Sequence, residues 1–358
     1  MHGDGIKLAT TTHNPRSTKS YVASASSAYR MRWKRRRLLW RSWRSRHQLT
    51  CIADRTALIG RNDLVAVMTL RNELQRLPHF FEYYRALGVS HFLVIDNHSD
   101  DGTADFLADQ PDTSVWWTPS SYRAARFGVD WMTWLQMRYC SGLWSLMLDA
   151  DELLVYAHHE TRSLAELTQW LEAQGRSVFG TMMLDLYPRQ PLGHQEYNIG
   201  EDPLHCVQWF DSGPYRAQRQ LPVHNLWVQG GVRERVFFQN APQRSPTLNK
   251  IPLIKWHHSF AYLNSCHSAL PPRLNREFDG PGSDMPSGVL LHTKFLPDIV
   301  EKAREDRSRQ QHFAEPNAML GYYDAILDHP CMWTPESVKY EGWQQLEALG
   351  LMSSGGWK

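Results

Sequence analysis

Short apolar runs alternate with amphipathic stretches along residues 61–155. We predict buried strands at 64–68, 91–95, 115–117 and 144–148, because these runs are short and apolar, and the first is also rich in β-branched residues. Helical spacing predicts helices at 77–87, at about 104–108 and at 121–139. Apolar strands joined to helices by short connections are typical of α/β folds, so we expect a mixed, mostly parallel sheet flanked by helices.

The pattern is less regular after residue 155. Ser163 and Glu166 form a capping-box pattern, which predicts the start of a helix that runs to residue 173. We further predict strands at 178–186 and 289–295, a long loop at 188–222 and a charged, exposed helix at 298–313.

Polar clusters follow three of the predicted strands, at 69–73, 96–103 and 149–152. Because the carboxyl ends of parallel strands meet at one edge of a sheet, we expect the three clusters to lie together there. Ligands bind at that edge in open parallel sheets.

The third cluster carries three carboxylates in four residues, Asp149, Asp151 and Glu152. Such groups repel one another unless a hard cation such as Mg²⁺ or Mn²⁺ neutralises them. The alternative is a solvated loop or a helix N-terminus, where acids are also stabilised. His292 and Lys294 would share one face of a strand, where imidazole can complete a metal shell and an ammonium can neutralise a diphosphate. The alternative for His292 is a hydrogen-bonded structural role.

Composition narrows the class of protein. The chain has 358 residues, 42% apolar and 21% charged, which excludes a wholly disordered, collagen-like or coiled-coil chain. No apolar run suggests a spanning helix or a secretory signal, and five scattered cysteines favour a reducing cytoplasm over a disulfide framework or zinc site. Phosphate-loop, dinucleotide-binding, nucleophile-elbow and zincin motifs are missing from the sequence.

The charge is distributed unevenly. Residues 1–53 hold twelve Lys or Arg and one acid, whereas the remaining chain holds 27 basic and 36 acidic residues. Residues 1–29 are poor in large apolar side chains and are expected to be disordered. Residues 30–46 predict a basic helix with Trp33, Leu39/Trp40 and Trp43 on one face, which suits an anionic membrane surface. The alternatives are contact with nucleic acid, or an arm that is merely solvated or packed on the body.

Four ordered motifs carry a resemblance to a known family. They are TLRNE at 69–73, HFLVIDNHSDDGT at 91–103, SYRAARFG at 121–128 and LMLDADE at 146–152. Residues 63–155 thereby resemble the nucleotide-sugar-binding half of a glycosyltransferase with the GT-A fold, in a bacterial branch of glycosyltransferase family 2. LMLDADE resembles the DxD motif of such enzymes, and a looser similarity continues to about residue 330.

The resemblance implies a GT-A-like fold and roles for particular residues. Asp149, Asp151 and His292 would hold Mn²⁺ or Mg²⁺. The nucleotide diphosphate would lie against Arg71, Asn72, Glu73, Asp96, Asp101, Arg126, Asp149 and Lys294.

A general base for the acceptor hydroxyl is also expected if the reaction inverts the sugar. Asp185, at the end of a predicted strand, is the first candidate and Glu234 the second. The alternatives are a turn residue for Asp185 and an ion pair with Arg233 or Arg235 for Glu234.

The sequence is therefore interpreted as a metal-dependent glycosyltransferase. It would move a sugar from a nucleotide-diphosphate-sugar, most simply a UDP-sugar, to a glycan or lipid-linked acceptor in bacterial surface or exported polysaccharide synthesis. We expect a basic arm at 1–58, a GT-A-like domain at 59–330 (nucleotide-sugar side 59–155, acceptor side 156–330) and a tail at 331–358.

We expect a cytoplasmic location, peripheral at the inner face of the plasma membrane if the arm binds lipid, and no nucleic-acid partner. Two other functions use the same features. One is a metal-dependent phosphoesterase or nucleotidyltransferase, and the other is a non-enzymatic membrane-surface adaptor that acts through its arm.

Overall fold

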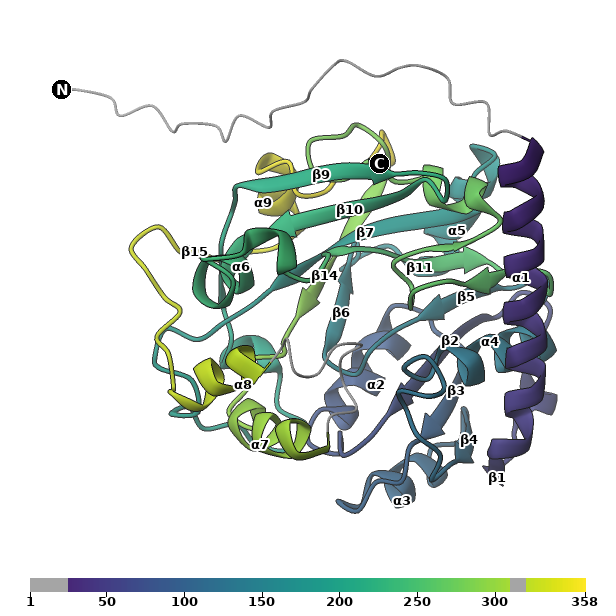
Figure 1. The fold of residues 1–358 in the computed structure, drawn as a ribbon, viewed down its shortest axis with the longest axis horizontal. Helices are drawn as coiled ribbons and strands as arrows, with labels where there is room; N and C mark the ends of the chain where they lie inside the picture. The colour runs from purple at the N-terminus through teal and green to yellow at the C-terminus, as the bar shows by residue number, and fades with distance from the viewer. Residues whose placement is uncertain (1–24, 310–319) are drawn as a thin grey trace.

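A nine-stranded mixed sheet forms the centre of the molecule (Figure 1). The computed structural model describes residues 25–309 and 320–358. The strands lie in the spatial order β1 (Thr50–Ala53), β4 (Thr113–Trp117), β3 (His91–Asp96), β2 (Leu64–Leu70), β5 (Trp144–Met147), β11 (Asn249–Lys255), β7 (Val178–Asp185), β14 (Ser287–His292) and β6 (Glu152–Val155).

The α/β class and the mixed sheet are confirmed, but the expectation of a mostly parallel sheet is wrong. Strands β4, β3, β2 and β5 are parallel neighbours, as predicted, and β7 and β14 are also parallel. The other four neighbouring pairs are antiparallel. β11 enters reversed between β5 and β7, because the long connections after residue 155 let a strand arrive from either end of the sheet.

Helices cover both faces of the sheet and explain why the central strands are apolar throughout. In β2, Leu64 and Met68 face one core, which contains α2 (Leu77–Ala86) and α5 (Leu164–Ala173). Val65 and Val67 face the other, which contains α4 (Val129–Tyr139). A strand buried on both faces has no polar side to show in its sequence.

The remaining elements lie around this centre. The helices are α1 (Ala25–Ser45), α3 (Thr103–Ala108), α6 (Gly231–Phe237), α7 (Ile299–Arg309), α8 (Leu320–Leu327) and α9 (Trp343–Ala348). The small two-stranded sheets pair β9 (Tyr215–Gln220) with β10 (Asn225–Gly230), β12 (Ala261–Tyr262) with β13 (Ala269–Leu270), and β15 (Val338–Lys339) with β8 (Trp209–Phe210).

Three predicted elements need correction. The strand predicted at 289–295 is β14 and ends at His292, so Lys294 lies in the turn after the strand and does not share a strand face with His292. The loop predicted at 188–222 contains β8 and β9, which the hydrophobic pattern does not reveal because β9 is polar and largely exposed. The helix predicted at 121–139 begins only at Val129, because Arg126, Phe127 and Gly128 have positive φ angles of 55°, 59° and 74°. The capping box of Ser163 and Glu166 is confirmed at the start of α5.

The N-terminal region is more ordered than expected from residue 25 onward. The basic helix predicted at 30–46 is present as α1, which also includes residues 25–29, and residues 1–24 lie outside the described residues. α1 runs along one side of the body (Figure 1), where Arg41 donates to Asp130 of α4 at 2.9 Å. Among the helices of the described ranges, none combines the length and apolar character that crossing a bilayer requires.

Gly128 sets the position of the 121–128 segment over the end of β2. A Cβ atom added there would lie 2.7 Å from the Thr69 hydroxyl oxygen, so only glycine allows this approach. Gly142 also has a positive φ, of 93°, but an added Cβ would meet nothing within 4 Å.

We predict that Gly128→Ala lowers the free energy of unfolding more than Gly142→Ala does. The left-handed conformation should cost about 1–2 kcal/mol in each variant. Overlap with Thr69 should add about 1–3 kcal/mol for Gly128→Ala alone. Urea unfolding of the two variants measures the difference, and equal losses would show that the close approach contributes nothing.

Candidate functional site

A cavity of about 800 Å³ opens at the carboxyl ends of β2, β3 and β5. Residues from each of the three predicted polar clusters line it, including Thr69 to Glu73, Asn97, and Asp149 to Asp151. Lys302 of α7 and Tyr322 of α8 line it as well. The prediction that the clusters converge at one edge of the sheet is therefore confirmed.

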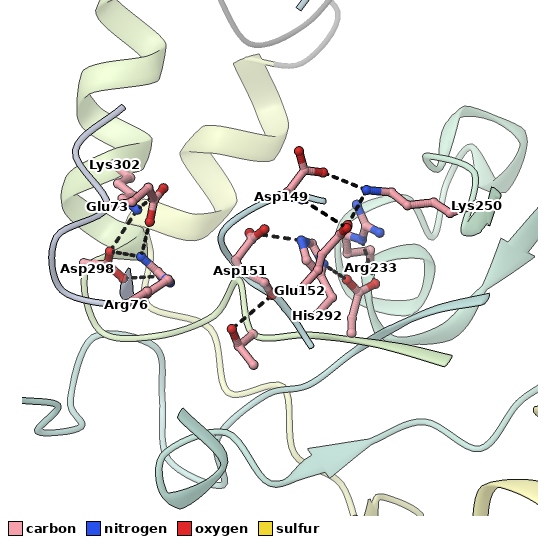
Figure 2. Close-up of polar contacts among 12 residues, drawn as sticks. Glu73, Arg76, Asp149, Asp151, Glu152, Arg233, Lys250, His292, Asp298 and Lys302 are labelled. Carbon is pink, nitrogen blue, oxygen red and sulfur yellow. Dashed lines mark hydrogen bonds and ion pairs between the residues drawn. The ribbon is translucent and has the colours of Figure 1, made fainter. Parts of the chain in front are cut away.

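A row of charged side chains crosses three neighbouring strands beside the cavity. The register of β14 places His292 next to Asp185 of the parallel strand β7 and next to Glu152 of the antiparallel strand β6. His292 Nε2 lies 3.1 Å from Asp151 Oδ2 (Figure 2). Its Nδ1 lies 2.6 Å from Asp185 Oδ1. The imidazole thus bridges two carboxylates.

In this row, neighbouring opposite charges offset the cost of burying each ionised side chain. Burial alone would lower the pKa of His292, but Asp151 and Asp185 outweigh it and raise that pKa. Burial would likewise raise the pKa of Asp151, but His292 holds it well below its usual range. Asp185 also accepts a hydrogen bond from Arg233 Nε at 2.7 Å, so both of its oxygens are engaged.

A second group of buried charges is formed by Lys250 of β11 and the carboxylates of the 149–152 cluster. Lys250 Nζ donates to Asp149 Oδ2 at 2.7 Å and also contacts Glu152 Oε1 (Figure 2). Lys250 and Glu152 are both buried, whereas the side chain of Asp149 is 45% exposed. Burial would lower the pKa of Lys250, but the carboxylate of Asp149 has the larger effect and raises it. The side chain therefore stays charged as an ammonium group.

A separate ion-pair cluster joins the segment after β2 to α7 (Figure 2). Arg76 donates two hydrogen bonds to Asp298, at 2.7 and 2.8 Å, and one to Glu73 at 3.0 Å. Lys302 Nζ donates to Glu73 Oε1 at 2.7 Å. Burial would raise the pKa of Asp298, but Arg76 and Lys302 lower it to about 2. These contacts hold α7 against the cavity.

The structure brings together most of the residues that the resemblance assigned to nucleotide and metal. The cavity lining includes Arg71, Asn72, Glu73, Asp149, Asp151, His292 and Lys294. Two of them also hold neighbouring segments in place. Arg71 lies 3.4 Å from Glu305 Oε1, and Asn72 Nδ2 donates to Asp100 at 2.8 Å.

Three residues expected to contact the nucleotide are not among those that line the cavity. Asp96 is buried and accepts a hydrogen bond from the Ser99 hydroxyl. Asp101 accepts from the backbone N–H groups of Leu74 and Thr103, at 3.1 and 3.0 Å, and so shapes the adjoining turn. Arg126 donates to Asp130 at 2.7 Å and to the Tyr262 carbonyl at 3.0 Å.

The two candidate general bases also lie outside the cavity lining. Asp185 is held by Arg233 and His292, as described above. Glu234 is held by Arg216 through two hydrogen bonds of 2.6 and 2.7 Å and accepts a third from Ser245 at 3.0 Å. The ion-pair alternative therefore describes Glu234 correctly, but the partner is Arg216 of β9 and not a flanking arginine.

Sequence reasoning missed the groups that hold the site together. Lys250 gave one usable signal, because it is a lysine at the start of the otherwise apolar run 250–254. Arg76 and Asp298 are 222 residues apart and gave none.

A possible set of metal ligands lies within the row, since one ligand atom from each of Asp151, Glu152 and His292 falls within 4.8 Å of the others. Asp151 and His292 face the cavity, whereas Glu152 is fully buried against Lys250. Asp149 also faces the cavity. Carboxylate oxygens with one imidazole nitrogen can bind a divalent cation while leaving positions open to ligand.

Comparisons with known proteins add no family assignment. No protein-family model matches the chain, and no curated protein matches it significantly.

We predict that Lys250→Met lowers the free energy of unfolding by about 3–5 kcal/mol, because it leaves Glu152 buried without its counter-charge. Lys255→Met is the matched control on the same strand. Its partner Glu172 is 41% exposed, so the loss should stay below about 1 kcal/mol. Chemical denaturation measures both values.

The double variant Lys250→Met/Glu152→Leu tests the cause of that loss. Replacing both partners by apolar side chains should recover most of the lost stability. If the double variant were as unstable as Lys250→Met, the loss would come from packing and not from the buried charge.

Proposed function

We propose that this protein is a metal-dependent glycosyltransferase with a GT-A-like fold, which moves a sugar from a nucleotide-diphosphate-sugar to an acceptor hydroxyl. The observation that carries the proposal is the pairing of Asp151 with His292 at the wall of the cavity. Asp151 comes from a DxD-like motif and His292 from a strand 141 residues later, and the distance from the ring Nε2 to the carboxylate Oδ2 is 3.1 Å. The ordered motifs at 69–73, 91–103, 121–128 and 146–152 support the same assignment.

The arrangement around His292 fits a divalent cation. A carboxylate can only accept, so Asp185 fixes the imidazole through Nδ1–H and leaves Nε2 directed toward Asp151. Histidine ligands of metals commonly donate their other ring N–H to a carboxylate in this way. Asp151 and His292, with Asp149 beside them, would hold Mn²⁺ or Mg²⁺. When bound, the cation would neutralise the charge that develops on the leaving diphosphate.

The remaining residues of the cavity suit the two ends of a nucleotide diphosphate. Lys294 lines the cavity two residues after His292, and its ammonium would contact the phosphates. Tyr122 and Phe127 line the cavity together with Asn97 and would form the surface against which the nucleobase packs. Arg71 and Glu73 also line the cavity and would contact the ribose end.

Asp185 takes a positioning role in this proposal. Its oxygens are held by Arg233 and His292, so it orients the imidazole and does not accept a proton from the acceptor. The acceptor would contact other residues of the lining, which include Gln243, Thr247 and Tyr322 of α8.

We predict that a nucleoside diphosphate with Mn²⁺ raises the melting temperature of the wild-type protein. A ligand at about 100 times its dissociation constant stabilises a protein by about 2.7 kcal/mol. The panel is UDP, GDP and dTDP, with CMP as a monophosphate comparison, each with and without Mn²⁺. The shift should require the metal and should disappear in Asp151→Ala.

Asp109→Ala is the matched control, because Asp109 is an exposed aspartate outside the cavity lining. It should keep the full shift. A shift that persists in Asp151→Ala, or no shift with any nucleotide, would contradict the proposed donor site. For the nucleotide that shifts, turnover of its sugar conjugates should release nucleoside diphosphate. Release of nucleoside monophosphate and pyrophosphate would indicate a nucleotidyltransferase or phosphoesterase instead.

A further inference from the structure

One face of α1 packs on the body of the protein. Leu38, Ser42 and Ser45 are buried on this face, and Leu38 packs in a small core with Ala261 and Leu270. Leu39 packs partly against that core. The prediction that Leu39 shares the face of the tryptophans is therefore wrong. α1 is therefore anchored through small and aliphatic side chains.

The largest side chains of α1 point the other way. Tyr29, Trp33, Trp40 and Trp43 are 60%, 53%, 54% and 45% exposed. At about 100° per residue, their spacing places them within a stripe roughly 80° wide, opposite Leu38 and Ser42. A helix of a globular protein normally turns such side chains inward, so this arrangement is the reverse of ordinary amphipathic packing.

Basic side chains surround the aromatic stripe, and residues 25–45 contain no acid. The exposed ones are Arg30, Arg32, Lys34, Arg36, Arg37 and Arg44. Guanidinium groups also cover the rings, with Arg36 5.6 Å from the Trp33 centroid, Arg44 4.8 Å from that of Trp40, and Arg46 3.6 Å from that of Trp43.

We propose that this exposed face of α1 binds the surface of an anionic lipid bilayer. The helix would lie parallel to the membrane, with Trp33, Trp40 and Trp43 at the level of the headgroups and the arginines paired with lipid phosphates. Tryptophan rings favour that depth, and basic residues near the surface are attracted to anionic lipid. A second copy of α1 is a poorer partner, because two faces of like charge would meet.

The packed face of α1 contacts two segments that also contribute residues to the cavity lining. Arg41 donates to the Ala124 carbonyl at 2.7 Å, and Phe127 of the same segment lines the cavity. Leu38 packs on Ala261, three residues before the cavity residue Asn264. If the proposed glycosyltransferase function holds, a membrane-bound acceptor would be near the site. The binding of α1 to lipid does not depend on that function.

The test is flotation of the full-length protein with lipid vesicles. The vesicles contain phosphatidylcholine alone, or phosphatidylcholine with roughly 30% phosphatidylglycerol to supply negative charge. We expect binding only to the anionic vesicles, weakened by salt. Trp33→Ser/Trp40→Ser/Trp43→Ser and Arg36→Gln/Arg37→Gln should each weaken it by about tenfold or more.

Arg61→Gln/Arg304→Gln is the matched charge control, because both arginines are exposed and lie outside α1. It should bind as the wild type does, and the melting temperatures of all variants should match, since the changed side chains are exposed. The proposal is overturned if the wild type does not bind anionic vesicles, or if the tryptophan variant binds equally well. It is also overturned if the tryptophans mediate dimerisation without lipid, or if RNA binds more tightly than the vesicles.

Discussion

A buried row of charges fixes the strands that meet at the carboxyl edge of the sheet. Ionised groups can be buried only if each has a partner of opposite charge and its hydrogen bonds are made. Arg233, Asp185, His292 and Asp151 meet this condition by alternating in sign along the row. The adjoining strands must therefore keep their register, because a slip of one residue would turn His292 to the other face of the sheet.

Ion pairs also fix two segments that contribute residues to the cavity lining. Lys250 balances Asp149 of the acidic loop and Glu152 of β6. Arg76 and Lys302 join the segment after β2 to α7. Asp149 and Asp151 then face the cavity with part of their surface exposed, which leaves carboxylate oxygens available to a ligand. The ion pairs neutralise the buried side chains, and the exposed oxygens of Asp149 and Asp151 are where an added cation can bind.

Local pattern was sufficient for the half of the fold that is built from neighbouring segments. Strands β2, β3, β4 and β5 follow one another along the chain, and the cluster at 149–152 could be placed from the apolar run before it. The antiparallel half could not be predicted, because β11 and β6 pair with strands distant in sequence. Asp185 was assigned as a base from its position at a strand end, but its environment is set by Arg233 and His292, 48 and 107 residues away.

In the proposed metal site, Asp151 and His292 bind the cation and Asp185 orients the imidazole. Electron paramagnetic resonance of free Mn²⁺, titrated with protein in the presence of a nucleoside diphosphate, measures the affinity of this site. Asp151→Asn and His292→Ala should abolish tight binding of Mn²⁺. At a temperature where the variant is folded, Asp185→Asn should weaken binding by about 10–100-fold, while Asp109→Asn should bind as the wild type does. Equal Mn²⁺ affinity in all four variants would show that these residues do not hold the cation.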